Sequence, residues 1–494
     1  MAPAHARPGL PSLGSALTKA MAGTAAAALR LDVQALFEQR GRMMQIATAL
    51  PDLALVPERA MVHEGVSGGF EWVVDCVASH PNFPLKLLIG EQMSLRLLQA
   101  DGTYKPWHGY VMEAAQLGSD GGLSRYRLVM RPWLAFLAHR HDAFIYREKT
   151  VEEIVADVFA DHPQANFRFE LQRPMPARSV CTQYRESDLA FVERLLAEEG
   201  LCTWYEHDAH GPDLAVARHA LHRLVITDRF ATLPHLGPVR YAMQHPTARL
   251  PEQRDSITAF AQHCRVQTQS VVRGSWRPRV LVGSSAERTS AAALALGDLP
   301  ILEDYDGAGE DRHLDPLHAD DVAERHLAAL ELGLQTHEGD GGARHLEAGR
   351  RFTLWDHGAL DGDYTLLSID HHITNNLGAQ AARLLAATDL AHGAYRNHFL
   401  AVPAERPLVP RARTRPALPG TQTAWIVGHD SPVHTDRDHR VIVQFAWQRG
   451  QRPGRRPLHP LGARGPALGR RELGRRGRAP HRHRGAGGLH RRRH

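Results

Sequence analysis

Much of the chain alternates apolar and polar residues, and this period of two limits the fold more than any other feature. In GGFEWVVDCVAS, residues 68–79, large apolar side chains fall at alternate positions, as in a strand with one buried face. RRFTLWDHG at 350–358 and DGDYTLLSIDHH at 361–372 repeat the pattern. Between residues 107 and 133, two strand candidates meet at SDGG, whose residue types favour a hairpin turn. The sequence therefore predicts a mostly β protein with some helices.

Three segments have helical signals instead. Thr150 and Glu153 match a capping box and precede an apolar face that ends at Phe159. A second helix should begin at Ser187 and stop at Gly200, a residue suited to a left-handed cap. A third is expected over residues 319–332.

A proline-rich stretch then separates two parts of the chain. Residues 402–420 contain five prolines, which predict a stiff linker that is extended rather than packed. After it, TAWIVG at 423–428 and HRVIVQFAW at 439–447 resemble two strands of a smaller β domain.

The positive charge of the chain is concentrated at its end. The net charge is +5, but residues 451–494 contain 14 Arg and one Glu, so residues 1–450 carry 45 basic and 53 acidic side chains, a net charge of −8. The body is therefore mildly acidic, and no nucleic-acid partner is expected for it. The tail lacks strand-forming residues and is expected to be disordered.

Cysteine usage and the N-terminal segment bear on compartment. The four cysteines lie far apart without a C-x-x-C pair, which suggests reduced thiols in a cytoplasmic protein. KAMAGTAAAALR at 19–30 is too weakly apolar for a signal peptide and too short to span a bilayer. Any export should use another route.

Two motifs suggest catalysis or metal binding, and neither has the required context. Gly65–Gly69 matches G-x-S-x-G, but a strand rather than a helix follows Ser67, so we do not expect a nucleophile there. His371 and His372 follow Asp370, yet neighbouring residues on a strand point to opposite faces, so both histidines should not bind one ion. Without other motifs, we expect no catalytic, cofactor-binding or metal site and no enzyme activity.

The most specific stretch is YRESDLAFVERLLAEEGLCTWYEHD at 184–208, a strand end, a helix, a glycine stop and an aromatic strand. It resembles the signature of the VgrG (valine-glycine repeat) family, the spike proteins of type VI secretion. Five further stretches between residues 108 and 447 agree with that family in order, so the resemblance covers about residues 31–450. They are HGYVMEAAQLGSDGGLSRYRLVMRPWLAFL, RRFTLWDHG with GDYTLLSIDHH, YRNHFLAVPAERPLVPR, TAWIVG and HTDRDHRVIVQFAW.

The resemblance implies a structural role. VgrG proteins join two phage tail-hub-like β-barrel domains to an OB-fold and a β-helix needle. Three copies form a homotrimer whose six barrels match the hexameric ring of the Hcp tube, within a baseplate, and the tip carries a PAAR-type protein and effectors. The contracting sheath drives the spike from the bacterial cytoplasm through a target membrane, without a signal peptide.

The expected organisation combines the residue patterns with this resemblance. In order, we expect a disordered N-terminal extension (1–30), a first hub β-barrel (31–150), a helical connection (151–180), a second hub β-barrel with helices (181–400), a proline-rich linker (401–420), an incomplete OB-fold as spike neck (421–450) and an Arg/Gly/Pro-rich tail (451–494).

The chain departs from the family pattern after Trp447, because the rest of the OB-fold and the needle do not follow. We favour an out-of-frame translation of GC-rich DNA as the origin of the tail and expect a spike that forms a hub but fails to penetrate. As a genuine arm, the tail would make this a polyanion-binding protein with salt-dependent affinity. A third reading, the baseplate hub of a tailed phage or phage-like particle, has the same architecture.

Overall fold

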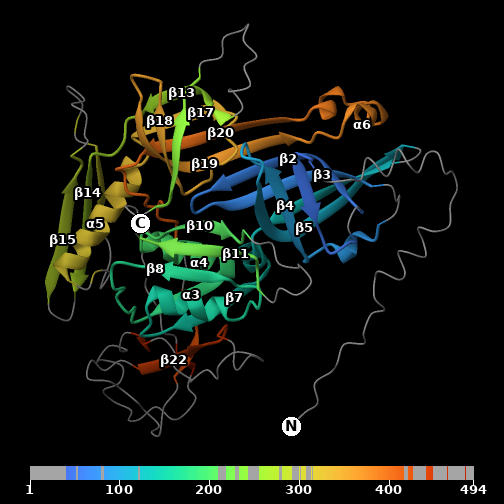
Figure 1. Cartoon of the computed structure of the whole chain (residues 1–494). Coiled ribbons are helices and arrows are strands. Elements are labelled where there is room, and N and C mark those ends of the chain that lie inside the picture. Colours follow the sequence, from blue (N-terminus) through green and yellow to red (C-terminus); the bar gives the residue numbers. More distant parts are fainter. Residues whose placement is uncertain are drawn as a thin grey trace.

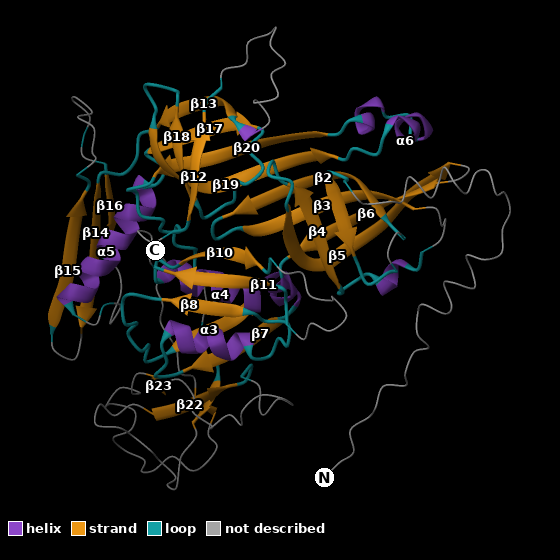
Figure 2. Cartoon of the chain, in the orientation of Figure 1, coloured by secondary structure: helices purple, strands orange, loops and turns teal. Residues whose placement is uncertain are grey.

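The computed structural model describes residues 41–416 with short gaps, together with 421–426, 441–448, 464–465 and 484–485. The gaps in the first range are 52–53, 79–82, 121–122, 210–218, 229–232, 243–254, 278–280, 292–299, 301, 308–312 and 314. The described part is mostly β with few helices, which confirms the predicted fold class (Figures 1 and 2). The expected N-terminal extension at 1–30 lies outside these residues.

Six antiparallel strands form one end of a 12-stranded sheet, and we call this group the first barrel after the expected hub domain. They are β1 (Met44–Ala47), β2 (Val56–Gly65), β3 (Gly69–Ala78), β4 (Gln92–Leu98), β5 (Tyr104–Asp120) and β6 (Leu123–Arg131), paired in the order β1-β4-β5-β6-β3-β2. β5 and β6 form the predicted hairpin, with Asp120 opposite Leu123. The predicted alternation of β3 is also confirmed, since Trp72 and Val74 are fully buried. Two short 3-10 helices, η1 (Leu85–Leu87) and η2 (Trp133–His139), accompany these strands.

The buried side chain of Asn375 links β1 and β2, which do not pair directly with each other. Its Oδ1 accepts a hydrogen bond from the Met44 N–H at 3.0 Å. Its Nδ2 donates to the carbonyl oxygens of Met44 at 3.1 Å and Pro57 at 2.7 Å. One side-chain amide thus satisfies backbone groups that a neighbouring strand would otherwise pair.

We expect Asn375→Ala to lower the free energy of unfolding by about 2 kcal/mol, because it leaves buried backbone groups without partners. Chemical denaturation monitored by tryptophan fluorescence measures this. Gln262→Ala is the control, since Gln262 is exposed and should cost less than about 0.5 kcal/mol. Equal losses in the two variants would contradict the role of Asn375.

Residues 141–227 form an α/β layer that packs on the first barrel. Its elements are β7 (His141–Tyr146), α3 (Val151–Phe159), β8 (Phe167–Glu170), β9 (Cys181–Ser187), α4 (Asp188–Glu198), β10 (Cys202–His207) and β11 (His222–Thr227). The strands pair as β10-β11-β8 and β7-β9. The predicted caps are confirmed: Thr150 and Glu153 form the capping box of α3, Ser187 caps α4, and Gly200 has a positive φ of 70°.

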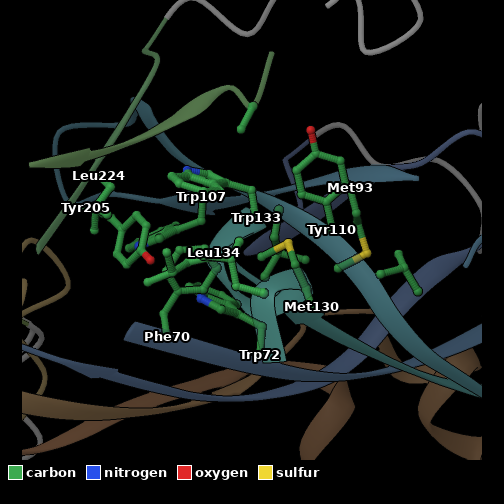
Figure 3. Close-up of a cluster of buried hydrophobic side chains, with 14 of the residues drawn as sticks. Phe70, Trp72, Met93, Trp107, Tyr110, Met130, Trp133, Leu134, Tyr205 and Leu224 are labelled. Carbon is green, nitrogen blue, oxygen red and sulfur yellow. The ribbon is translucent and has the colours of Figure 1, made fainter. Parts of the chain in front are cut away.

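The layer and the first barrel share one hydrophobic core. Trp72 and Trp107 of the barrel lie in it with their ring centroids 4.9 Å apart. Tyr205 and Leu224 of the layer belong to the same cluster (Figure 3). The structure therefore differs from the expected boundary at residue 181, because residues 181–227 pair within this layer and not in the second barrel. Alternation identifies a strand but not the sheet that it joins.

The second barrel consists of β12 (His235–Arg240), β13 (Ile257–Cys264), β17 (Gln335–Gly341), β18 (Arg351–Trp355), β19 (Gly362–Thr374) and β20 (Ala394–Pro403). They pair in the order β12-β18-β19-β20-β17-β13. β18 and β19 are the two strands predicted from RRFTLWDHG and DGDYTLLSIDHH, and they pair antiparallel. A short helix, α6 (Ala379–Leu384), and a 3-10 helix, η5 (Thr388–Ala391), connect β19 to β20.

A separate module interrupts this barrel between β13 and β17 (Figure 1). It contains β14 (Ser270–Arg277), β15 (Val282–Thr289), β16 (Glu303–Asp306) and α5 (Pro316–Glu331), and α5 packs on β14 and β15. The predicted helix at 319–332 is confirmed as α5. It starts three residues earlier, because the Asp315 side chain accepts a hydrogen bond from the His318 N–H and Pro316 follows it.

Both barrels lie on one continuous sheet. β2 of the first barrel pairs antiparallel with β19 of the second, from Ser368 opposite Gly65 to Thr374 opposite Arg59. The same β19 pairs with β20 on its other side. A backbone ladder thus joins the two barrels, and their relative orientation is fixed by hydrogen bonds as well as by packing.

Residues 404–416, which we call the strap, begin in a turn and contain no helix or strand, but they are not unpacked. Leu408 is 1% exposed and Val409 is 5% exposed. Leu408 packs with Cys202 and Trp204 of the α/β layer. The expectation of an unpacked linker was wrong here because prolines restrict the backbone at their own positions without preventing the apolar side chains between them from reaching a core.

The neck strands follow the strap. β21 (Ala424–Ile426) and β22 (Val441–Phe445) are the two predicted strands, and they pair antiparallel with Ala424 opposite Phe445. Two-residue strands, β23 (Arg464–Gly465) and β24 (Arg484–Gly485), pair with β22 and β21. At these four residues the tail forms strands that the sequence did not predict, since open strand edges accept any backbone except proline. The other residues of 451–494 lie outside the described part.

Candidate functional site

The serine of the G-x-S-x-G motif forms a structural contact. Ser67 lies in the turn between β2 and β3, with a positive φ of 56°. Its N–H donates to the Thr203 carbonyl at 2.8 Å, and its Oγ accepts from the Thr203 N–H at 3.2 Å. The turn also lines a cleft of about 940 Å³ together with His63. Nucleophilic catalysis requires a base that hydrogen-bonds the serine hydroxyl. The Nδ1 of His63 lies 2.7 Å from a carboxylate oxygen of Asp370 instead.

Asp370, His371 and His372, which are consecutive on β19, point alternately to the two faces of the sheet. His371 is 1% exposed, and its Nδ1 lies 2.7 Å from the Tyr395 hydroxyl. Asp370 and His372 are partly exposed on the opposite face. Burial lowers the pKa of His371 to about 3, so the ring is neutral. Among the described residues, no group of three or more His, Cys, Asp or Glu side chains is placed to hold a metal ion.

What the fold does bring together is a polar junction between the barrels. Lys105 of β5 forms an ion pair with Glu347, which lies in the loop before β18. The Lys105 ammonium also lies 4.6 Å from the centre of the Trp107 ring and donates to the His345 carbonyl at 3.3 Å. Arg350 Nε lies 3.4 Å from the other oxygen of Glu347. We call Glu64, Lys105, Trp107, Glu347 and Arg350 the barrel junction.

Two carboxyl groups in the barrel junction differ in protonation. Although burial raises the pKa of Glu347, Lys105 and Arg350 hold it below its usual value. Glu64 of β2 is 8% exposed, and burial raises the pKa of its carboxyl to about 7 against the opposing effect of Lys105. The sequence contained a signal for this residue, because Glu64 occupies the apolar phase of its strand, two positions after Val62.

We expect Glu64→Gln to raise the free energy of unfolding at pH 8 by about 2–3 kcal/mol. A carboxyl with a raised folded pKa holds its proton between about pH 4.5 and 7, where the unfolded chain has lost it, so stability falls as the pH rises through that window. The glutamine should remove this fall and match the wild type at pH 5. Chemical denaturation of both proteins at pH 5 and pH 8 tests this prediction, and the exposed Glu113→Gln is the control. The prediction is contradicted if the free energy of unfolding of the wild type does not fall relative to that of Glu64→Gln between these two pH values.

A second polar group lies inside the shared core of the first barrel and the α/β layer. His108 and His222 are fully buried, and their rings flank that of His207 at centroid distances of 6.1 and 6.2 Å. His108 Nε2 donates to the Asp208 carbonyl at 2.9 Å, and its Nδ1 lies 2.6 Å from Ser94 Oγ. His222 Nε2 accepts the Trp133 N–H at 2.8 Å. We call the three the histidine cluster.

The hydrogen bonds of the histidine cluster connect different segments of the chain rigidly. Burial lowers the pKa of His108 and takes that of His222 well below the usual value, so both rings are neutral hydrogen-bond partners. The barrel junction and the histidine cluster each connect strands of different parts of the chain. None of the described helices is long and apolar enough to span a membrane.

Known proteins share this architecture and sequence. Residues 63–377 match the phage tail baseplate hub (GPD) family. The chain is 33% identical over 408 residues to the type VI secretion system spike protein VgrG4b of Pseudomonas aeruginosa, covering 78% of this chain and 47% of that protein. It is 28% identical to VgrG1b of the same species, covering 83% and 53%. The chain thus spans about half the length of these relatives.

A solved structure agrees with the fold. The c3393 protein of Escherichia coli is described as a type VI secretion component with structural similarity to the T4 phage tail proteins gp27 and gp5. It superposes with a TM-score of 0.56 at 18% identity, over 82% of this chain and 89% of that chain. The resemblance predicted from residues 184–208 is confirmed by these matches. The chain belongs to the phage tail baseplate hub family, and its sequence is similar to that of VgrG spike proteins of type VI secretion.

Proposed function

We propose that this chain is the hub of a type VI secretion spike. Three copies assemble into a ring of six barrels that caps the hexameric Hcp tube, contacts baseplate proteins and is driven through a target membrane when the sheath contracts. The observation that carries the proposal is the β2–β19 ladder, which fixes two barrels in each chain. Three such pairs provide six barrels for a six-membered ring.

The role is mechanical, and the described contacts support it. Load on one barrel passes to the other through a backbone ladder and through the ion pairs of the barrel junction. Ser67 and His371 both make hydrogen bonds that hold the fold together, so we assign them no catalytic part. Production in a bacterial cytoplasm and export by the secretion system itself belong to the same proposal, as do a PAAR-type tip protein and effectors as further partners.

Mass measurement and tube binding test the proposal. Light scattering on the purified chain should give three times the monomer mass, and the trimer should co-sediment with preformed Hcp rings. A chain that stays monomeric and leaves the rings unbound would contradict it. Phage tail-tube rings serve as the comparison, because preferential binding to them would favour the baseplate hub of a phage instead.

A further inference from the structure

The strap connects the second barrel to the neck strands, and it follows a defined path over the hub. It begins with the Ala404 N–H donating to the Asp363 carbonyl at 2.9 Å. Leu408 and Val409 are then buried against the α/β layer. Gly200 permits this approach, because a Cβ there would lie 3.4 Å from Val409 and 2.8 Å from Arg325. The apolar part of the strap therefore sits at the C-terminal end of α4.

Two arginines fasten the exposed half of the strap to α4. Arg413 lies 2.5 Å from Glu193, and Arg415 lies 2.7 Å from Glu198. Arg411 stands on the same stretch but makes no ion pair with any described residue. Ion pairs on the surface usually contribute little to stability, so the contribution of these two pairs depends on how deeply their carboxylates are buried. The arginines are 48% and 52% exposed, whereas Glu193 and Glu198 are 23% and 11% exposed, so releasing an arginine leaves a poorly hydrated carboxylate.

Glu198 is also the point where other parts of the hub meet. Arg178 of the α/β layer reaches it at 2.6 Å, and Arg194 of α4 reaches it at 3.1 Å. The next residue, Glu199, pairs with Arg178 at 2.5 Å and with Arg325 of α5 at 3.5 Å. Acidic residues at a helix C-terminus are unfavourable by themselves, and this concentration of arginines compensates for them.

Beyond the strap, the neck strands rest on the α/β layer next to the start of α4. Tyr184 of β9 contacts Trp447 edge to face at 5.1 Å. Gln422 joins the pair, since its Nε2 donates to the Tyr184 hydroxyl at 3.2 Å and its Oε1 accepts from Trp447 Nε1 at 2.6 Å. Ile145 of β7 packs with Ala424, Val443 and Phe445. The neck thus has its own small contact with the hub.

From these contacts we infer that the strap is a fastening device that sets the position of the neck on the hub, and that the Arg413–Glu193 and Arg415–Glu198 pairs hold it closed. The prolines of the strap restrict its backbone rotations, so that docking orders few additional ones. When the pairs are broken, the exposed half of the strap detaches and the neck keeps only its own contact. The mechanical meaning of this device rests on the proposed function, whereas its docking is a property of one chain.

Limited trypsin digestion of the full chain tests the inference. Trypsin cleaves after arginine, and the bonds after Arg411 and Arg413 report an open strap. The variant Glu193→Gln with Arg415→Gln weakens both pairs and keeps both cleavage sites. Glu198 retains Arg178 and Arg194 in this variant, so α4 should stay folded. Mass spectrometry of the products should show cleavage at these two bonds about five- to tenfold faster than in the wild type.

Two further variants make the result specific. The control Asp157→Asn with Arg240→Gln weakens two exposed ion pairs elsewhere and should leave strap cleavage unchanged. Exchanging the charges of one pair, with Glu193→Arg and Arg413→Glu, should leave cleavage after Arg411 about as slow as in the wild type. Wild-type rates in the first variant, or the same acceleration in the control, would overturn the inference. The assay needs no trimer and no tube, so its outcome is independent of the proposed function.

Discussion

Replacing Lys105 with methionine should lower the free energy of unfolding by about 3–4 kcal/mol. Methionine keeps the apolar stem on the Trp107 ring but removes the charge that faces Glu347. The two charged side chains of this pair are only 17% and 21% exposed, so the carboxylate that remains is poorly hydrated. Removing one partner of such a pair costs more than the pair contributes, because the other charge stays buried. Urea denaturation at pH 7 measures the loss.

Lys149→Met is the matched control for this change. Lys149 pairs with Asp157 on the surface of α3, where the side chains are 34% and 44% exposed, so its loss should cost less than about 1 kcal/mol. Adding Glu347→Gln to Lys105→Met should recover part of the stability, since without the lysine the buried carboxylate keeps only Arg350, at 3.4 Å, as a charged partner. The assignment of the barrel junction fails if the two lysine variants lose equal stability, or if the double variant recovers nothing.

The local elements of this fold are encoded in short stretches and could be predicted. The alternation in 68–79 gave β3, the Thr150–Glu153 spacing gave the start of α3, and Gly200 gave the end of α4. Each depends on groups within a few residues of one another. The sheet that a strand joins does not depend on nearby groups, because β2 pairs with β19, which lies about 300 residues later in the chain. The α/β layer was misassigned for the same reason.

The barrel junction was missed for a related reason. Lys105 and Glu347 are ordinary surface residue types, and nothing in their own segments marks them as partners. Glu64 alone carried a signal, as a carboxylate in the apolar phase of a strand, and such a residue needs a compensating charge. A similar argument applies to Asn375, whose side chain replaces a missing strand neighbour. Polar residues at apolar positions therefore point to long-range contacts that periodicity cannot identify.

Acidification should destabilise the chain strongly through its buried histidines. A folded pKa below the unfolded value of about 6.5 means that only the unfolded chain takes up protons as the pH falls, so stability decreases below about pH 6.5. Each histidine that stays neutral in the folded state lowers the free energy of unfolding at pH 5 by about 2 kcal/mol. Burial lowers the pKa of His371 to about 3 and that of His222 well below the usual value, so His371 alone should account for a loss of about 2 kcal/mol between pH 7.5 and 5, and His222 adds to it. Glu64 acts in the opposite direction over part of this range, so the measurement is sharpest in Glu64→Gln.

The geometry of His222 explains why the folded state resists protonation there. Its Nε2 already accepts a hydrogen bond from the Trp133 N–H at 2.8 Å. A proton on that nitrogen would place two N–H donors face to face. His222→Gln keeps an acceptor without a titrating group, so it should reduce the loss of stability between pH 7.5 and 5. Phe70→Leu is the control, because Phe70 lies 5.5 Å from the same ring and its loss should lower stability equally at both pH values. If His222→Gln also shifts both values equally, the histidine is only a packing residue, and the acid sensitivity of this core has another source.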